Sequence, residues 1–291
     1  MDNLLFGDNQ FFGVNHMSEE KARAQSIRFQ DIQEVYAVLD AAYDEGIRTF
    51  MCTTHDRMAE VCEHVRTNPE TYRDYLFYPC MPYAHKYANA ATEDGILGAI
   101  GRFLPAGGIL SAAIRGGTSL ATRDIEGITT LLIDSEMKMF HGLNTPVIFL
   151  QNVVTDLLLG LGAKKALRIF AEHVRSRYGA EPGFITMNMP MLLDVLEEAG
   201  IENPIVCSSI NKIGFRMCGG IEAYERALRE RKFRAVAMSV LASGAISPTE
   251  ALAWVCSQPN IQSIVFGASS KSNIRSTKQL VDSYWHPNEG N

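Results

Sequence analysis

The chain alternates short apolar runs with longer amphipathic stretches, and this alternation restricts its possible folds more than any other feature of the sequence. Such a pattern predicts parallel strands joined by helices rather than by hairpin turns. The apolar runs lie at residues 4–6, 49–53, 76–81, 147–151, 184–188, 205–208, 235–240 and 263–267. Eight βα units are the number that closes a (β/α)8 TIM barrel, an α/β fold, and we expect that fold here.

The stretches between these strands have helical periodicity and recognisable helix ends. Apolar residues recur at helical spacing through 32–43, with Asp31 as the expected N-cap. A later helix is expected to begin with Ser247 as its cap and Pro248 at its first position. Further helical patterns occupy residues 163–178, 191–199, 221–231 and 248–258. The last four βα units should therefore be regular.

The third and fourth predicted strands are separated by more chain than one crossover requires. Residues 92–145 comprise a segment at 92–105, a stretch with glycine pairs at 107–108 and 116–117, and a helical pattern at 124–140. We interpret this stretch as an insertion between strands 3 and 4. An insertion that follows a strand's carboxyl end covers the mouth of a barrel, where function concentrates, although padding at the periphery is the alternative.

Composition and charge exclude several classes of protein. A chain of 291 residues with 46% hydrophobic and 21% charged residues fits a single barrel domain spanning 1–291. The net charge of −6, without long basic runs, argues against nucleic acid as a partner. The first residues carry an acid where a secretory signal has basic residues, and no stretch is apolar enough to cross a membrane, so we expect a cytoplasmic protein. The six cysteines have no C-x-x-C spacing, which favours reduced, structural thiols.

Several segments in the C-terminal half are similar to those of one enzyme family. Residues 184–188 (FITMN), 235–244 (AVAMSVLASG), 251–259 (ALAWVCSQP) and 267–273 (GASSKSN) resemble, in order and spacing, strands and loops of the aldo/keto reductases. The resemblance covers more than a third of the chain and implies a (β/α)8 barrel. It does not by itself carry the family's reaction.

The resemblance also implies a position for a nicotinamide cofactor. In the family, the loops similar to 239–244 and 267–273 hold the pyrophosphate and the adenosine end. Small residues and backbone N–H groups at a helix N-terminus suit a phosphate, so NADP is a possible cofactor. The alternative is a tight strand-to-helix turn with a capping serine. The residues assigned to the cofactor in this way are Ser239, Gly267, Ser269, Ser270, Lys271 and Arg275.

The family's catalytic Asp, Tyr, Lys and His are all replaced at the matching positions. Met51 stands at the aspartate and Asp56 at the tyrosine, no lysine ends the third strand, and Gln151 stands where histidine is expected. Asn188 resembles the asparagine that binds the nicotinamide amide, whereas Ser208 and Asn211 replace the family's glutamine and ring-stacking tyrosine. A standard reductase is therefore not expected.

Polar residues that follow the strands are the alternative candidates, because barrel active sites form at the carboxyl ends of strands. We predict His55, Asp56 and Asp8 as catalytic, since an imidazole and carboxylates perform acid–base chemistry near neutral pH. The ordinary alternatives are a surface histidine and a loop whose polar side chains bond their own backbone. The predicted substrate-binding residues are Asn9, Gln10, His16, Tyr83, His85, Gln151 and Asn188.

A metal centre and a nucleophilic triad are weaker interpretations. His16, His55, Asp8 and Asp56 could supply nitrogen and oxygen ligands, but their spacing matches no metal signature, so we predict no metal. No nucleophile-elbow motif precedes a serine or cysteine.

Three functions remain open at the level of sequence. The first is an aldo/keto reductase-like barrel enzyme with a rebuilt site that acts on a small polar substrate. A phosphorylated, and therefore anionic, substrate is one option within this hypothesis. The second is an NAD(P)H-dependent oxidoreductase with a non-standard proton donor. The third is a non-catalytic binding or regulatory barrel.

Overall fold

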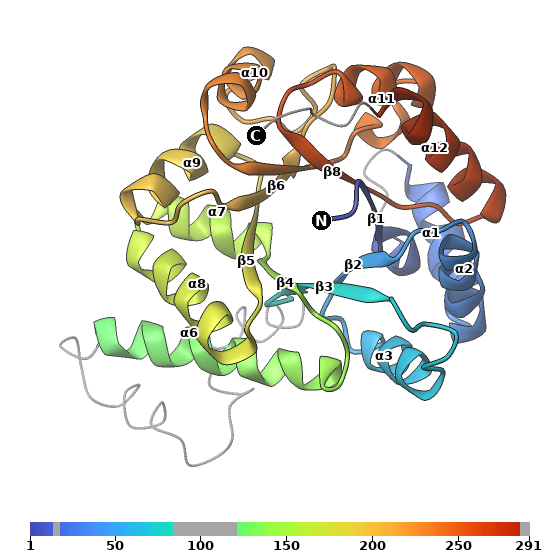
Figure 1. Ribbon diagram of the computed structural model, residues 1–291, viewed down its shortest axis with the longest axis horizontal. Helices are drawn as coiled ribbons and strands as arrows, with labels where there is room; N and C mark the ends of the chain where they lie inside the picture. The colour runs from blue at the N-terminus through green and yellow to red at the C-terminus, as the bar shows by residue number, and fades with distance from the viewer. Residues whose placement is uncertain (14–17, 84–120, 286–291) are drawn as a thin grey trace.

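A computed structural model describes residues 1–13, 18–83 and 121–285 of the chain. Within them, eight parallel strands close into a barrel in which each strand pairs with its sequence neighbours (Figure 1). Closure occurs at the first strand, where Leu5 is in register with Thr49 on one side and Val265 on the other. The strands are β1 (Leu4–Gly7), β2 (Thr49–Thr53), β3 (Leu76–Met81), β4 (Val147–Leu150), β5 (Glu181–Thr186), β6 (Ile205–Ser209), β7 (Arg234–Met238) and β8 (Ile261–Phe266). The predicted fold is confirmed.

Helices surround the barrel and begin where the sequence places their caps. Asp31 accepts a hydrogen bond from Gln33 N at 2.9 Å, and Ser247 caps the helix that begins at Pro248. The helices are α1 (Glu19–Arg28), α2 (Ile32–Asp44), α3 (Met58–Thr67), α6 (Ala121–Met137), α7 (Asn152–Gly160), α8 (Lys164–Tyr178), α9 (Met189–Glu198), α10 (Ile221–Glu230), α11 (Pro248–Cys256) and α12 (Lys271–Tyr284), with short 3-10 turns η1 (Asn9–Phe12), η2 (Lys138–Phe140) and η3 (Ala242–Gly244).

Most element boundaries lie within two or three residues of the sequence-based expectation, and two differences bear on the site. β5 begins at Glu181 and ends at Thr186, because the side chain of Asn188 already caps α9. In the predicted insertion, the helical pattern at 124–140 corresponds to α6 and η2, whereas residues 92–120 lie outside the described part of the chain. Asp134 of α6 is bonded to His173 and Tyr178, which attaches this helix to α8.

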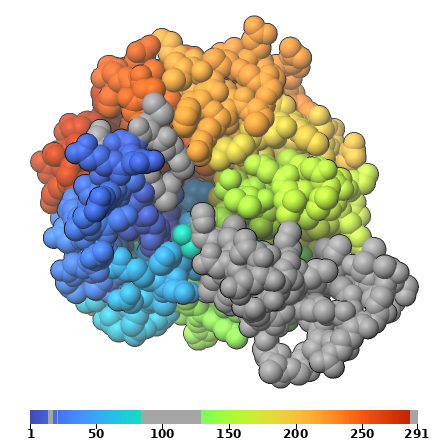
Figure 2. Space-filling model, turned by 180° about the vertical axis from the view of Figure 1, so that it is seen from behind, coloured from blue at the N-terminus to red at the C-terminus, as the bar shows by residue number. Residues whose placement is uncertain are grey.

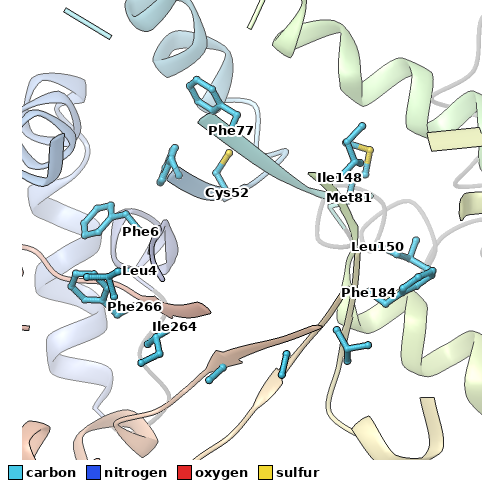
Figure 3. Packing of buried hydrophobic residues seen from close by; sticks show 14 of the residues in the cluster. Leu4, Phe6, Cys52, Phe77, Met81, Ile148, Leu150, Phe184, Ile264 and Phe266 are labelled. Carbon is cyan, nitrogen blue, oxygen red and sulfur yellow. The ribbon is translucent and has the colours of Figure 1, made fainter. Parts of the chain in front are cut away.

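The core has two layers. Large side chains on the outer face of the strands, including Phe6, Phe77 and Phe184, point away from the barrel axis toward the helices (Figure 3). A second cluster fills the barrel itself and includes Tyr78, Phe149 and Val236. The ring of Phe149 fills the space that a side chain on Gly183 would need. Packing is therefore dense at mid-barrel, and space remains only nearer the strand ends.

The last helix closes the ring of helices against the first part of the chain. α12 and α2 lie side by side in both views of the molecule (Figures 1 and 2). Lys271 pairs with Asp44, and Arg275 pairs with Glu45. Among the described residues, no helix is long and apolar enough to cross a membrane.

Candidate functional site

A cavity of about 290 Å³ opens at the carboxyl ends of the strands, and every strand or the loop that follows it contributes to its lining. Its deep wall is apolar, and polar side chains surround its entrance. The lining residues are Gly7, Asp8, Asn9, Phe12, Met51, Thr53, Cys80, Tyr83, Gln151, Asn152, Val153, Ile185, Met187, Cys207, Arg216, Met238, Ser239 and Val265. This is the end of the barrel at which binding sites of this fold form.

Among the described residues that line the cavity, Asp8 is the one with a carboxylate side chain. It directly follows β1 and is only 5% exposed. The backbone N–H and the hydroxyl of Thr53 both donate to its Oδ2, each at 2.7 Å. Burial raises the pKa of Asp8 above its usual value, and the two bonds from Thr53 oppose that rise only in part. The cavity therefore holds a carboxyl group that ionises less readily than an exposed aspartate.

His55 lies in a stack of rings beside the cavity. Its ring is 4.2 Å from that of Phe12 in a stacked geometry and 5.4 Å from that of Tyr83 in an edge-on geometry. Its Nδ1 accepts a hydrogen bond from the backbone N–H of Arg57 at 3.1 Å. Because Phe12 and Tyr83 both line the cavity, the imidazole supports the wall of the cavity from behind.

Glu136 of α6 connects the ends of β2 and β3. It is 2% exposed, and its Oε2 accepts hydrogen bonds from the hydroxyl of Thr54 and, at 3.2 Å, from the backbone N–H of Tyr83. Thr54 precedes His55 in the chain, so this one carboxylate fixes the backbone on both sides of the ring stack. The helix predicted within the insertion thus contributes directly to the geometry of the site.

Among the described residues that line the cavity, Arg216 is the one with a cationic side chain. It lies in the loop after β6. Buried Asn211 holds that loop: its amide donates to Phe215 O and accepts from Phe215 N, both at 2.8 Å. The backbone of Arg216 has a φ of 55°, in the left-handed region that costs a non-glycine residue energy. Its guanidinium lies 5.5 Å from the centre of the Phe215 ring.

Ser239 also lines the cavity with a left-handed backbone, at a φ of 54°. Backbone strain of this kind persists where the surroundings enforce it, and it concentrates at functional positions. Two of the strained residues of the described chain therefore face the same cavity from neighbouring strands.

The structure distributes the predicted substrate-binding residues among different places. Asn9, Tyr83 and Gln151 line the cavity together with Asp8. The predicted catalytic residue Asp56 is exposed, in the turn before α3. The amide oxygen of Asn188 accepts from Met191 N at 3.4 Å as the cap of α9, outside the cavity lining. His16 and His85 lie outside the described residues.

Gln10 and Gly267 form a contact that the sequence did not indicate. Gln10 is buried and donates to the carbonyl of Gly7 at 2.8 Å. Its Oε1 occupies the space that a Cβ on Gly267 would need. The glycine predicted to let a ligand's phosphate approach the backbone instead accommodates a side chain of the same protein.

The other residues assigned to a nicotinamide cofactor are also engaged within the chain. The carbonyl of Ser269 accepts from Arg28 at 2.5 Å, and Ser270 is the N-cap of α12. Lys271 and Arg275 form the ion pairs with α2 described above. Of this set, Ser239 alone lines the cavity. The contacts of these residues are thus made within the chain, and their assignment to a dinucleotide stays a prediction.

We expect the double variant Lys271→Ala/Arg275→Ala to lose a small amount of stability and no affinity for nucleotides. The hydrogen bond from Arg275 lowers the pKa of Glu45. The pair lies at the surface, where Arg275 is exposed and Glu45 is partly buried, and surface ion pairs stabilise proteins little. Thermal melting at low and high salt, with calorimetric titration of NADPH, measures both effects. Tight NADPH binding that the double variant abolishes would restore the cofactor role.

Two thiols are the remaining reactive side chains of the cavity. Cys80 and Cys207 line the cavity, and burial raises the pKa of both thiols. Within the described part of the chain, no cluster of three His, Cys, Asp or Glu side chains is arranged to hold a metal ion. Two neutral thiols and the carboxyl of Asp8, whose pKa is raised, are therefore ionisable groups at the deep end of the site.

The fold and the site together define a (β/α)8 barrel with an apolar interior and a polar entrance at the strand ends. No family model matches the chain, and no curated protein matches its sequence. The solved structures that it resembles include several aldo-keto reductases.

One of these is an aldo/keto reductase from Brucella melitensis, with 11% identity and a TM-score of 0.55 over 96% of this chain and 88% of that one. Another is the thermostable aldo-keto reductase Tm1743, solved with the inhibitor epalrestat, with 14% identity and a TM-score of 0.55 over 97% and 90%. A third, from Pseudomonas aeruginosa and provisionally assigned as an aldo-keto reductase, has 12% identity and a TM-score of 0.59 over 97% and 90%. The chain therefore shares the (β/α)8 barrel fold of these reductases, as its sequence segments predict.

Proposed function

We propose that this barrel is an enzyme with a rebuilt site, in which Asp8 exchanges a proton with a small polar anionic substrate that Arg216 binds. The observation that carries the proposal is the buried carboxyl of Asp8 in the wall of the cavity that every strand, or the loop after it, helps to line. Likeness to the aldo-keto reductases supports the barrel and the location of the site, not the reaction.

The chemistry of Asp8 follows from its surroundings. Thr53 places two donors on Oδ2, so the proton of the neutral acid resides on Oδ1. Because burial raises its pKa, the carboxyl can donate this proton to a substrate oxygen and accept one in a later step. The bonds from Thr53 also fix the carboxyl orientation, which a general acid needs.

His55 acts as a positioning residue in this proposal. With Nδ1 accepting the N–H of Arg57, a neutral imidazole carries its proton on Nε2. The ring keeps Phe12 and Tyr83 in place at the cavity wall. The direct acid–base role predicted for His55 with Asp56 remains a separate prediction.

Arg216 sets the charge of the substrate. A planar guanidinium pairs with a carboxylate or a phosphate through two parallel hydrogen bonds. Asn9 and Gln151 add neutral hydrogen-bonding groups at the same entrance. An anion at Arg216 with an oxygen near Asp8 uses both ionisable groups of the cavity.

The test is conversion of small acids and phosphate esters by the purified chain, followed by mass spectrometry of the compound pool. Val153 is exposed at the cavity entrance, and Leu161 is exposed at the other end of α7. Val153→Trp should therefore slow any conversion, whereas Leu161→Trp, the matched control, should not. Binding of compounds without conversion would assign the chain to the non-catalytic class and overturn the proposal.

We also expect negligible NADPH oxidation with common aldehydes. Asp56 stands where the family resemblance places the tyrosine acid, and a general acid contributes on the order of 10² to 10⁴-fold to such reactions. An absorbance assay with several aldehydes measures this directly. Rapid turnover would favour the oxidoreductase with a non-standard proton donor, with Tyr83 or His55 as its first candidates.

A further inference from the structure

The deep wall of the cavity is unusually rich in sulfur. The chain has 6 cysteines and 12 methionines among 291 residues, about one position in sixteen. Of the 18 residues that line the cavity, five contain sulfur, where composition alone would give about one. These residues are Met51, Cys80, Met187, Cys207 and Met238, and they come from five different strands or strand ends. The enrichment therefore belongs to the cavity and not to one element of the chain.

The state of the two thiols decides what such a wall can bind. Burial raises the pKa of Cys80 well above the usual value for a thiol, and the same cause acts on Cys207. Both groups are therefore neutral, and the wall consists of uncharged, polarisable sulfur atoms. Such atoms bind soft metal ions best as thiolates, whereas neutral sulfur makes favourable contacts with aromatic rings.

The rest of the cavity restricts the ligand further. Its volume of about 290 Å³ is at the lower end of the range for small-molecule sites. Arg216 supplies a positive charge at the entrance, and Asn211 holds the loop that carries it. A ligand that satisfies both ends is small, has one flat unsaturated face and carries one anionic group.

We propose that the cavity selects small aromatic carboxylates, with the ring against the sulfur-rich wall and the carboxylate at Arg216. The assignment rests on the proposed function, because it concerns the same site, and it names the class of substrate. Each sulfur–ring contact favours an aromatic ring over a saturated one, so several contacts together should give a preference of about tenfold.

Calorimetric titration of the full chain with benzoate and with cyclohexanecarboxylate tests this preference at constant size and charge. We expect benzoate to bind about tenfold more tightly. The double variant Met51→Leu/Met238→Leu should bring the ratio of the two dissociation constants close to one, since leucine keeps the volume and removes the sulfur. Met58→Leu, at a buried methionine of α3 outside the cavity, is the matched control and should leave the ratio unchanged. Arg216→Gln should weaken both acids by the same factor.

Three outcomes would overturn the proposal. The first is equal affinity for the two acids, and the second is a change of ratio in Met58→Leu as large as in the double variant. The third is retention of Ag⁺ that Cys80→Ser/Cys207→Ser abolishes, together with equal acid binding, which would make the sulfur atoms metal ligands. Melting curves of each variant identify any that fails to fold, and single Met→Leu variants then replace the double one. Conversion of non-aromatic acids with no aromatic preference would refute this inference alone and leave the proposed function standing.

Discussion

Asp8→Asn is expected to lower turnover of the native substrate by a factor on the order of 10² to 10⁴, the usual contribution of a positioned general acid. Asparagine keeps the size of the side chain and an oxygen that can accept from Thr53, so the fold should be retained. The carboxamide cannot release a proton to the substrate. Turnover of a substrate identified by the compound screen, with melting temperature as the control, measures the effect.

The pH dependence of the native enzyme provides an independent check on Asp8. Its pKa is raised in the folded chain, so the neutral acid persists above the pH at which an exposed aspartate ionises. A step that needs the acid should slow as pH rises through this raised pKa, and Asp8→Asn should lose that limb of the profile. The same shift stabilises the fold at low pH, and this contribution is lost as pH rises through the folded-state pKa.

Asp56→Asn is the matched comparison for the same experiment. Asp56 is exposed in the turn before α3, and it is the other carboxylate that the sequence predicted as catalytic. We expect little change in turnover from this substitution. A loss as large as that of Asp8→Asn would return the acid–base role to the His55–Asp56 pair.

Gly183→Ala is expected to destabilise the barrel by about 1–3 kcal/mol, the usual cost of overpacking a dense core. A Cβ at this position would overlap the ring of Phe149, which is fully buried inside the barrel and cannot swing into solvent. The ring packs near Tyr78 at 6.1 Å between centres, so moving it disturbs a second strand. Denaturant unfolding measures the change in free energy.

A double-mutant cycle isolates the contact between these two residues. Phe149→Leu alone should destabilise the chain by leaving a void, but it removes the ring atoms that the new methyl group meets. The pair Gly183→Ala/Phe149→Leu should therefore lose less stability than the sum of the two single variants. Strict additivity would show that the methyl group is accommodated by backbone movement rather than by the ring.

The sequence predicted the barrel well because its signals are local. Alternation of apolar runs and helical periodicity located all eight strands, and Asp31 and Ser247 act as the caps that their positions indicated. The strand after α8 was placed three residues late, because Pro182 and Gly183 weaken the strand pattern although both are buried in the sheet.

The candidate site was predicted only in part, because its geometry depends on contacts distant in sequence. Asp8, Asn9, Tyr83 and Gln151 follow strands and could be named from that position. Arg216 lies 19 residues before the nearest segment of the family resemblance, which begins at residue 235. The glycines around it, such as Gly214 and Gly219, are the only local sign of an irregular loop. Glu136 lies within a helical pattern that gave no sign of its bonds to Thr54 and Tyr83, 82 and 53 residues away.

The reactivity of buried thiols can be used to measure local opening of the barrel. Cys52, Cys62, Cys80 and Cys207 are buried on β2, α3, β3 and β6, whereas Cys218 is exposed in the loop after β6. Cys80 and Cys207 line the cavity, so a small reagent can enter beside them without unfolding. An alkylating reagent can reach Cys52 or Cys62 only after the strands or helices that cover it separate, while Cys218 reacts from the native state. The labelling rates of Cys52 and Cys62 relative to Cys218 therefore measure how often β2 and α3 open, and the faster of the two marks which element separates first.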